Sequence, residues 1–161
     1  MSFIKSIFGS KSDSDKPARK ITRANDLEKG DIIALTDSFA LPELLRGQEF
    51  QVTAVNSYEY EHSTDTEWVL TGTQNQELFL TLDIDDKTYL KFALKISRDD
   101  VETLFDLDDF STLFDEPGNA EFNRIQDNEL TSGWSSEAYR QSIFAKVGFF
   151  HRKDHRRERL S

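Results

Sequence analysis

An alternation of apolar and polar residues between Gln48 and Ile96 constrains the fold of this chain more than any other feature. Its last part, residues 90–96, reads Leu-Lys-Phe-Ala-Leu-Lys-Ile, so every second residue is large and apolar. Successive side chains of a β-strand point to opposite faces, and a period of two therefore predicts a strand with one buried face. Apolar runs at 50–54, 68–70 and 78–82 predict three further strands in the same region.

The connections between these expected strands are short and polar, and they lie at 61–65, 71–75 and 83–87. Parallel strands need a crossover of a dozen or more residues, so short links predict antiparallel hairpins. Upstream, the pattern Leu27-x-x-Gly30-Asp31 predicts a turn that leads into another strand, because glycine accepts positive φ and aspartate can bond the turn backbone. Trp68 lies within a predicted strand, and we expect it to be a core residue.

Two helices are predicted after the strands. Ser97 and Asp100 have the spacing of a capping box, and the apolar residues that follow predict a helix over 101–114 with Leu104 and Phe105 facing inward. A second helix is predicted from Ser135 or Ser136 to about Val147. The fold class is therefore α+β: a strongly twisted antiparallel sheet, or a partly open β-barrel, with one or two packed helices.

The predicted domain organisation has three parts. At 161 residues the chain fits one domain. Residues 1–20 are expected to form a flexible leader and linker, 21–150 a single α+β domain, and 151–161 a charged tail that frays.

Charge is unevenly distributed along the chain. The net charge is -10, which disfavours nucleic acid as a partner because like charges repel. Residues 1–24 hold six basic and two acidic residues, and 151–161 hold five basic and two acidic. Residues 98–128 between them hold ten acidic and two basic residues. Two basic ends thus flank an acidic region.

The sequence offers no set of catalytic residues. It has no cysteine, which excludes disulfides, thiolate catalysis and cysteine-bound metals. His151 and His155 have a spacing that could hold a metal on one helix face, but the arginines around them oppose a dication. Glycine-rich phosphate loops and a Gly-x-Ser-x-Gly elbow are also missing from the sequence. We therefore expect no enzyme activity, no metal and no cofactor.

Two stretches are candidates for binding. The acidic amphipathic stretch 101–114 could dock into a basic, apolar groove of a protein partner; the alternative is an ordinary helix that covers the sheet. The start of the chain would present one apolar face if it became helical on a surface, giving weak peripheral membrane contact. The alternatives are a disordered leader and a leader that packs against its own domain. The candidate partner-binding residues are Leu104, Phe105, Asp108, Asp109 and Phe110, and the candidate membrane-contact residues are Phe3, Ile4, Ile7 and Phe8.

Soft motifs between residues 27 and 96 resemble a bacterial family. The motifs are Leu27-x-x-Gly30-Asp31, Gly47-x-x-Phe50-x-Val52, Tyr58-x-Tyr60, Glu67-Trp68-x-Leu70 and Leu78-x-Leu80. This pattern resembles a domain of unknown function, a small β-domain often encoded near phage-shock (PspA-like) membrane-stress proteins and polyamine-synthesis genes. The resemblance implies a bacterial accessory protein of the cytoplasm, linked to envelope stress, and it implies no catalytic residue.

The sequence thus leads to two main functional expectations, with an enzyme or small-ligand carrier as a third. The first is a non-enzymatic binding or adaptor protein that acts through protein–protein contacts, located in the cytoplasm or peripherally at the inner membrane. The alternative is an acidic immunity-type inhibitor that blocks a basic partner enzyme. The sequence names neither the partner nor an oligomeric state.

Overall fold

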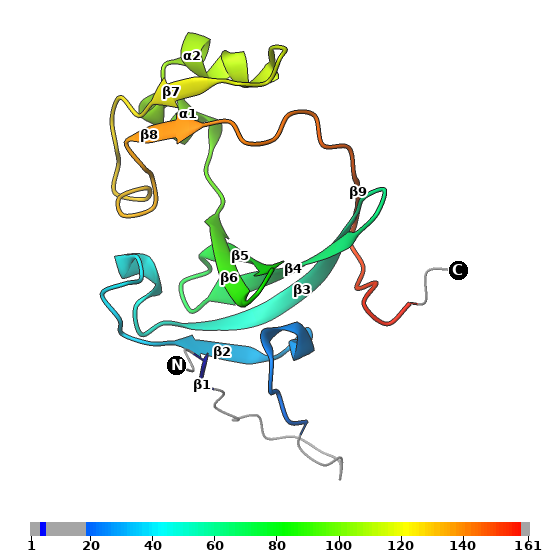
Figure 1. Cartoon of the computed structure of the whole chain (residues 1–161). Helices are drawn as coiled ribbons and strands as arrows, with labels where there is room; N and C mark the ends of the chain where they lie inside the picture. Colours follow the sequence, from blue (N-terminus) through cyan, green and yellow to red (C-terminus); the bar gives the residue numbers. More distant parts are fainter. Residues whose placement is uncertain (1–3, 6–18, 159–161) are drawn as a thin grey trace. The chain divides into compact units, whose positions relative to one another are not determined.

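The computed structural model describes Ile4, Lys5 and residues 19–158, and the chain divides into two compact units (Figure 1). Unit 1 comprises Met1–Leu94 together with Gly148–Ser161, and unit 2 comprises Lys95–Val147. Unit 2 is therefore inserted in the sequence of unit 1. Each unit is described by itself below.

Unit 1 is built on one antiparallel sheet, which confirms the predicted hairpins. The strand order is β1-β2-β3-β4-β5-β6, and β9 also pairs with β3. Two short 3-10 helices, η1 and η2, lie in the connections before β2 and β3. The bounds are β1 Ile4–Lys5, η1 Ala24–Asp26, β2 Ile32–Leu35, η2 Glu43–Leu45, β3 Glu49–Glu59, β4 Thr64–Gly72, β5 Glu77–Ile84, β6 Thr88–Leu94 and β9 Phe149–His151.

The long strand β3 organises the sheet, because two other strands share one of its edges. Its first part pairs with β2 and its last part pairs with β9, while β4 runs along the opposite edge. The register shifts between Val52 and Ala54, and a β-bulge of this kind bends a strand and increases its twist. The curvature of β3 and β4 is visible in Figure 1.

Trp68 lies at the centre of the unit 1 core, as predicted. Its side chain is fully buried, and its indole N–H donates a 2.9 Å hydrogen bond to the carbonyl of Leu27. Leu27 belongs to the predicted turn, in which Gly30 has φ of +98° and the Asp31 carboxylate accepts a bond from the Glu28 N–H. The turn is fixed to the bulge of β3, since the Gly30 N–H donates to the Val52 carbonyl at 2.7 Å. These bonds confirm the predicted turn and tie it to the core.

Unit 2 is small and contains short elements. Ser97 caps the first helix and forms the predicted box with Asp100. The predicted helix over 101–114 is broken, because the chain is extended at Phe105 and Asp106, where the Asp106 side chain caps a second helix. The bounds are α1 Arg98–Leu104, α2 Leu107–Ser111, η3 Thr112–Phe114, β7 Glu121–Asn123 and β8 Ala138–Arg140.

An aromatic cluster forms the core of unit 2. Phe105 meets the rings of Phe122 and Tyr139 edge to face, with centroids 5.1 and 5.2 Å apart. Leu104 and Phe105 are buried, which confirms that they face inward. The second predicted helix, from Ser135 or Ser136 to Val147, is wrong: Tyr139 lies in β8, and most of the remainder is irregular. Tyr139 packs on Phe122 of the paired strand β7, and this contact replaces a helical face.

Candidate functional site

The C-terminal segment of unit 1 lies against the sheet. The sequence suggests a fraying tail here, but β9 pairs with β3 and the residues after it are also held. The fully buried hydroxyl of Ser57 donates to the carbonyl of Lys153 at 2.8 Å and accepts from the N–H of His155 at 3.1 Å. These contacts join residues nearly one hundred positions apart and bring residues 151–158 next to the turn before β2.

Arg156 connects this segment to the N-terminal part of unit 1. Its guanidinium donates to the carbonyls of Asn25 and Leu27, and it pairs with Asp154 at 2.6 Å. The same group lies over the ring of Trp68, 5.1 Å from the centroid, in a cation–π contact. The pKa of Asp154 is lowered, first by its side-chain hydrogen bond with Arg156. Arg156 is thus fixed by four residues: Asn25, Leu27, Asp154 and Trp68.

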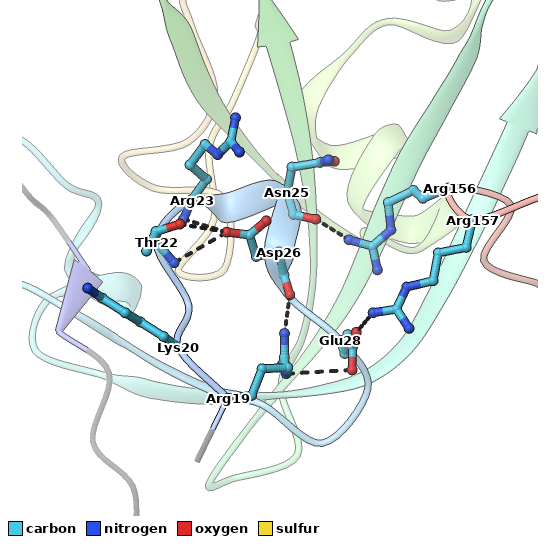
Figure 2. Close-up of a pocket in the computed structure, with 9 residues that line it drawn as sticks. All are labelled: Arg19, Lys20, Thr22, Arg23, Asn25, Asp26, Glu28, Arg156 and Arg157. Carbon is cyan, nitrogen blue, oxygen red and sulfur yellow. Dashed lines mark hydrogen bonds and ion pairs between the residues drawn. The ribbon is translucent and has the colours of Figure 1, made fainter. Parts of the chain in front are cut away.

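A pocket of about 450 Å³ opens where the two ends of the described chain meet (Figure 2). We call it the basic pocket, because its lining holds five cationic side chains and two carboxylates. The two basic ends seen in the sequence thus contribute to one surface. The lining residues are Arg19, Lys20, Thr22, Arg23, Asn25, Asp26, Glu28, Arg156 and Arg157.

Part of the charge in the basic pocket is balanced internally. Arg19 binds Asp31 and lies 3.6 Å from the carboxylate of Glu28, and its pKa is raised, chiefly by the hydrogen bond to Asp31. Arg157 binds the other oxygen of Glu28. The Glu28 carboxylate is therefore held between two guanidinium groups, Arg19 and Arg157, as Figure 2 shows.

The other carboxylate, Asp26, belongs to a turn. It accepts bonds from the hydroxyl and N–H of Thr22 and from the N–H of Arg23, and these bonds lower its pKa, the Thr22 hydroxyl most. Lys20 and Arg23 are exposed, and neither forms an ion pair with another residue in the described part of the chain. These two side chains supply the uncompensated positive charge of the pocket.

The predicted partner-binding residues of unit 2 divide into buried and exposed members. Leu104 and Phe105 belong to the core, and Phe110 is partly buried and stacks on Phe105 at 5.7 Å. Asp108 and Asp109 are exposed in the first turn of α2.

Two apolar side chains are also exposed here, Leu107 in α2 and Phe114 in η3, which follows α2 directly. Leu107 is 45 % exposed and Phe114 is 75 % exposed. We call Leu107, Asp108, Asp109 and Phe114 the acidic surface. The sequence prediction of partner-binding residues included neither Leu107 nor Phe114, so it missed this apolar contribution.

The two histidines lie together in unit 1 without a metal-binding group around them. The rings of His151 and His155 are 4.6 Å apart, His151 bonds Glu59 at 2.9 Å, and His155 lies 3.6 Å from Glu158. Within Ile4, Lys5 and residues 19–158, no group of three or more His, Cys, Asp or Glu side chains is arranged to hold a metal ion.

Of the predicted membrane-contact residues, Ile4 lies in β1 and pairs with Leu35 of β2. Phe3, Ile7 and Phe8 fall outside the described residues. No helix in the described part of the chain has the length and apolar character needed to cross a bilayer. Comparison with known proteins adds no relative: no family model, curated protein or solved structure matches the chain.

Proposed function

We propose that this chain is a non-enzymatic binding or adaptor protein, and that the acidic surface of unit 2 is its contact with a protein partner. The observation that carries the proposal is the exposure of two apolar side chains next to Asp108 and Asp109 of α2: Leu107 in the same helix, and Phe114 in η3, which follows α2 directly. Apolar side chains beside charges are the ordinary composition of a protein interface: the apolar part is desolvated, and the charges select the partner. The matching partner is a basic surface with an apolar groove.

The lowered pKa values of Asp100 and Asp127 are explained by local structure rather than by a catalytic role. The pKa of Asp100 is lowered first by the Ser97 hydroxyl, and the pKa of Asp127 first by the Thr131 hydroxyl. Both carboxylates bond groups of their own turn or cap, so the shifts are explained by local structure. A catalytic acid or base needs a pKa near the operating pH, and these shifts move the carboxylates away from it.

The cellular setting that we propose rests on the resemblance of residues 27–96. We propose a bacterial accessory protein linked to envelope stress, in the cytoplasm or peripherally at the inner membrane. A partner found among envelope-stress proteins would support this setting, and a partner without any such link would contradict it.

The alternative function is an acidic inhibitor of a basic enzyme. It is favoured by the net charge of -10 and by the ten acidic residues between 98 and 128. The acidic surface would serve both functions, and they differ in what the partner does. Activity of the purified partner, measured with and without this chain, distinguishes them: loss of activity at stoichiometric addition supports an inhibitor.

The test is photo-crosslinking from residue 111 in cells, with identification of the crosslinked protein by mass spectrometry. The affinity of that protein is then measured for the wild type and for Asp108→Lys/Asp109→Lys. The matched control is Asp85→Lys/Asp86→Lys, which makes the same charge change at exposed residues of the β5–β6 turn. We expect binding to be lost only in the first variant. Equal binding by both variants would refute the acidic surface as the contact.

A further inference from the structure

We propose that the basic pocket of unit 1 binds the phosphate group of a small molecule or of a lipid headgroup. This site is independent of the proposed protein contact, because it lies in unit 1 and shares no residue with the acidic surface of unit 2. Four features of the pocket support this assignment: its local charge, the division of its cations into fixed and unpaired groups, the way it holds the Glu28 carboxylate, and its size.

The local charge is opposite to that of the whole chain. The pocket lining holds five cations and two carboxylates, and Asp31 and Asp154 outside the lining pair with Arg19 and Arg156, so the local balance is +1, whereas the chain carries -10. The cations come from residues 19–23 and from 156–157, so the fold itself places like charges side by side. Like charges in one hollow raise the energy of the empty site and attract an oppositely charged ligand. A phosphate ester carries up to two negative charges, which match the two lining cations without an ion pair among the residues that the structure describes, Lys20 and Arg23.

The cations divide into a fixed and an unpaired group. Arg156 and Arg19 are anchored by carbonyl and carboxylate partners, which hold their guanidinium groups in place. Lys20 and Arg23 are exposed and form no ion pair within the described part of the chain. A ligand can therefore bind these two without breaking an existing ion pair. The side-chain amide of Asn25, in the same lining, can add an uncharged donor.

The pocket already shows how it holds an oxyanion. The carboxylate of Glu28 is shared by Arg19 and Arg157. Guanidinium groups bind carboxylate and phosphate oxygens with the same fork of N–H donors, so an arginine that holds Glu28 can hold a phosphate. Arg157 is 80 % exposed, which leaves it able to turn from Glu28 to a ligand.

Size and overall charge restrict the class of ligand. A volume of about 450 Å³ lies within the range of small-molecule sites, roughly 300 to 1,000 Å³. A long polyanion such as nucleic acid would extend beyond the pocket and meet the negative field of the rest of the chain. One phosphate-bearing group, soluble or on a lipid, fits both conditions.

The test uses full-length protein labelled with nitrogen-15 and follows amide signals while inorganic pyrophosphate is added at low salt. We expect saturable shifts at Thr22, Arg23 and Asn25. Lys20→Gln/Arg23→Gln should weaken binding about tenfold or more, the effect of losing one or two charge-assisted hydrogen bonds. The matched control is Lys87→Gln/Arg152→Gln, which removes one lysine and one arginine that are exposed outside the pocket and should leave binding unchanged.

A second arm identifies the source of the phosphate. The same proteins are sedimented with vesicles of phosphatidylglycerol and with vesicles of phosphatidylcholine. Binding of pyrophosphate alone indicates a soluble ligand, and binding of phosphatidylglycerol that is lost in Lys20→Gln/Arg23→Gln indicates a lipid headgroup. Failure to bind either probe, or equal weakening by the control variant, overturns the proposal. Neither result bears on the acidic surface, whose variants are tested separately.

Discussion

Replacing Trp68 should remove the central support of unit 1. The side chain is fully buried, its indole N–H bonds the Leu27 carbonyl at 2.9 Å, and Arg156 lies over its ring. One residue thus connects β4, the turn before β2 and the C-terminal segment. The change Trp68→Ala removes all three connections together.

The magnitude follows from the separate contributions. Truncating a buried aromatic side chain to alanine costs about 3–5 kcal/mol, including the cavity left behind. The lost hydrogen bond adds about 1 kcal/mol, because the Leu27 carbonyl keeps its bond from Arg156 and is not left unpaired. The cation–π contact adds about 0.5–1 kcal/mol. The total of about 5–7 kcal/mol is comparable to the whole stability of a small domain, about 5–15 kcal/mol.

The assay is native-state hydrogen exchange, because a chain of two units need not unfold in one step. The free energy of opening measured at the β4 amides should fall by about 5 kcal/mol or more in Trp68→Ala. Trp68→Phe is the matched control: it keeps most of the buried apolar volume, loses the indole N–H, and should cost about 1–2 kcal/mol. If β4 protection in Trp68→Ala stays within 1 kcal/mol of the wild type, the reasoning about this core is refuted.

Three further predictions concern single contacts and pH. Ser57→Ala removes the hydrogen-bond partner of the Lys153 carbonyl and of the His155 N–H, so it should cost about 1–3 kcal/mol and speed tryptic cleavage after Lys153. The exposed control Ser63→Ala should have neither effect, and equal cleavage of both variants would argue against the contact. Asp100→Ala removes the capping box of α1 and should lower amide protection there by about 1 kcal/mol, an effect absent from its exposed neighbour variant Asp99→Ala. The free energy of unfolding should fall in acid, because four aspartates have folded pKa values below the ordinary 3.8. Their contribution to this free energy is complete above about pH 4 and is lost as the pH falls through the lowered pKa values. Urea midpoints from pH 5 to pH 2 measure this, and a midpoint that stays constant over that range would contradict it. The four aspartates are Asp26, Asp100, Asp127 and Asp154.

Local patterns in the sequence predicted the parts of the fold that local physics controls. The period of two before Ile96 predicted the strand that the structure shows as β6. The pattern around Gly30 predicted a turn, where φ is positive, and Ser97 was predicted as the helix cap that it is. Each of these depends on residues within a few positions of one another. The buried position of Trp68 was predicted for the same reason, because it lies in a strongly apolar strand.

The wrong helix prediction has a different cause, because the structure of that segment depends on contacts with residues distant in the sequence. The spacing of Tyr139, Ile143 and Val147 fits a helix, but Tyr139 packs on Phe122, while Ile143 and Val147 are exposed. Ala145 also has φ of +51°, which a helix does not allow.

The sequence indicated the charge of the basic pocket but not the pocket itself. Excess positive charge at both ends of the chain is visible in the sequence, but its gathering into one hollow depends on Ser57 and Arg156. Neither residue has a local signal: one is a serine within a strand, the other an arginine among arginines. Long-range hydrogen bonds of this kind leave no periodic trace in a sequence.

The insertion of unit 2 within unit 1 has a consequence for synthesis on the ribosome. Strands β1 to β6 emerge first, but β9 and Arg156 emerge only after all of unit 2 has been made. Domains generally begin to fold as they emerge, at about 5–20 residues per second. Until then the Leu27 carbonyl lacks its arginine, the Ser57 hydroxyl lacks its partners, and the last edge of β3 is unpaired. For a few seconds, the nascent sheet therefore has an unpaired edge on the last part of β3, which another strand could occupy.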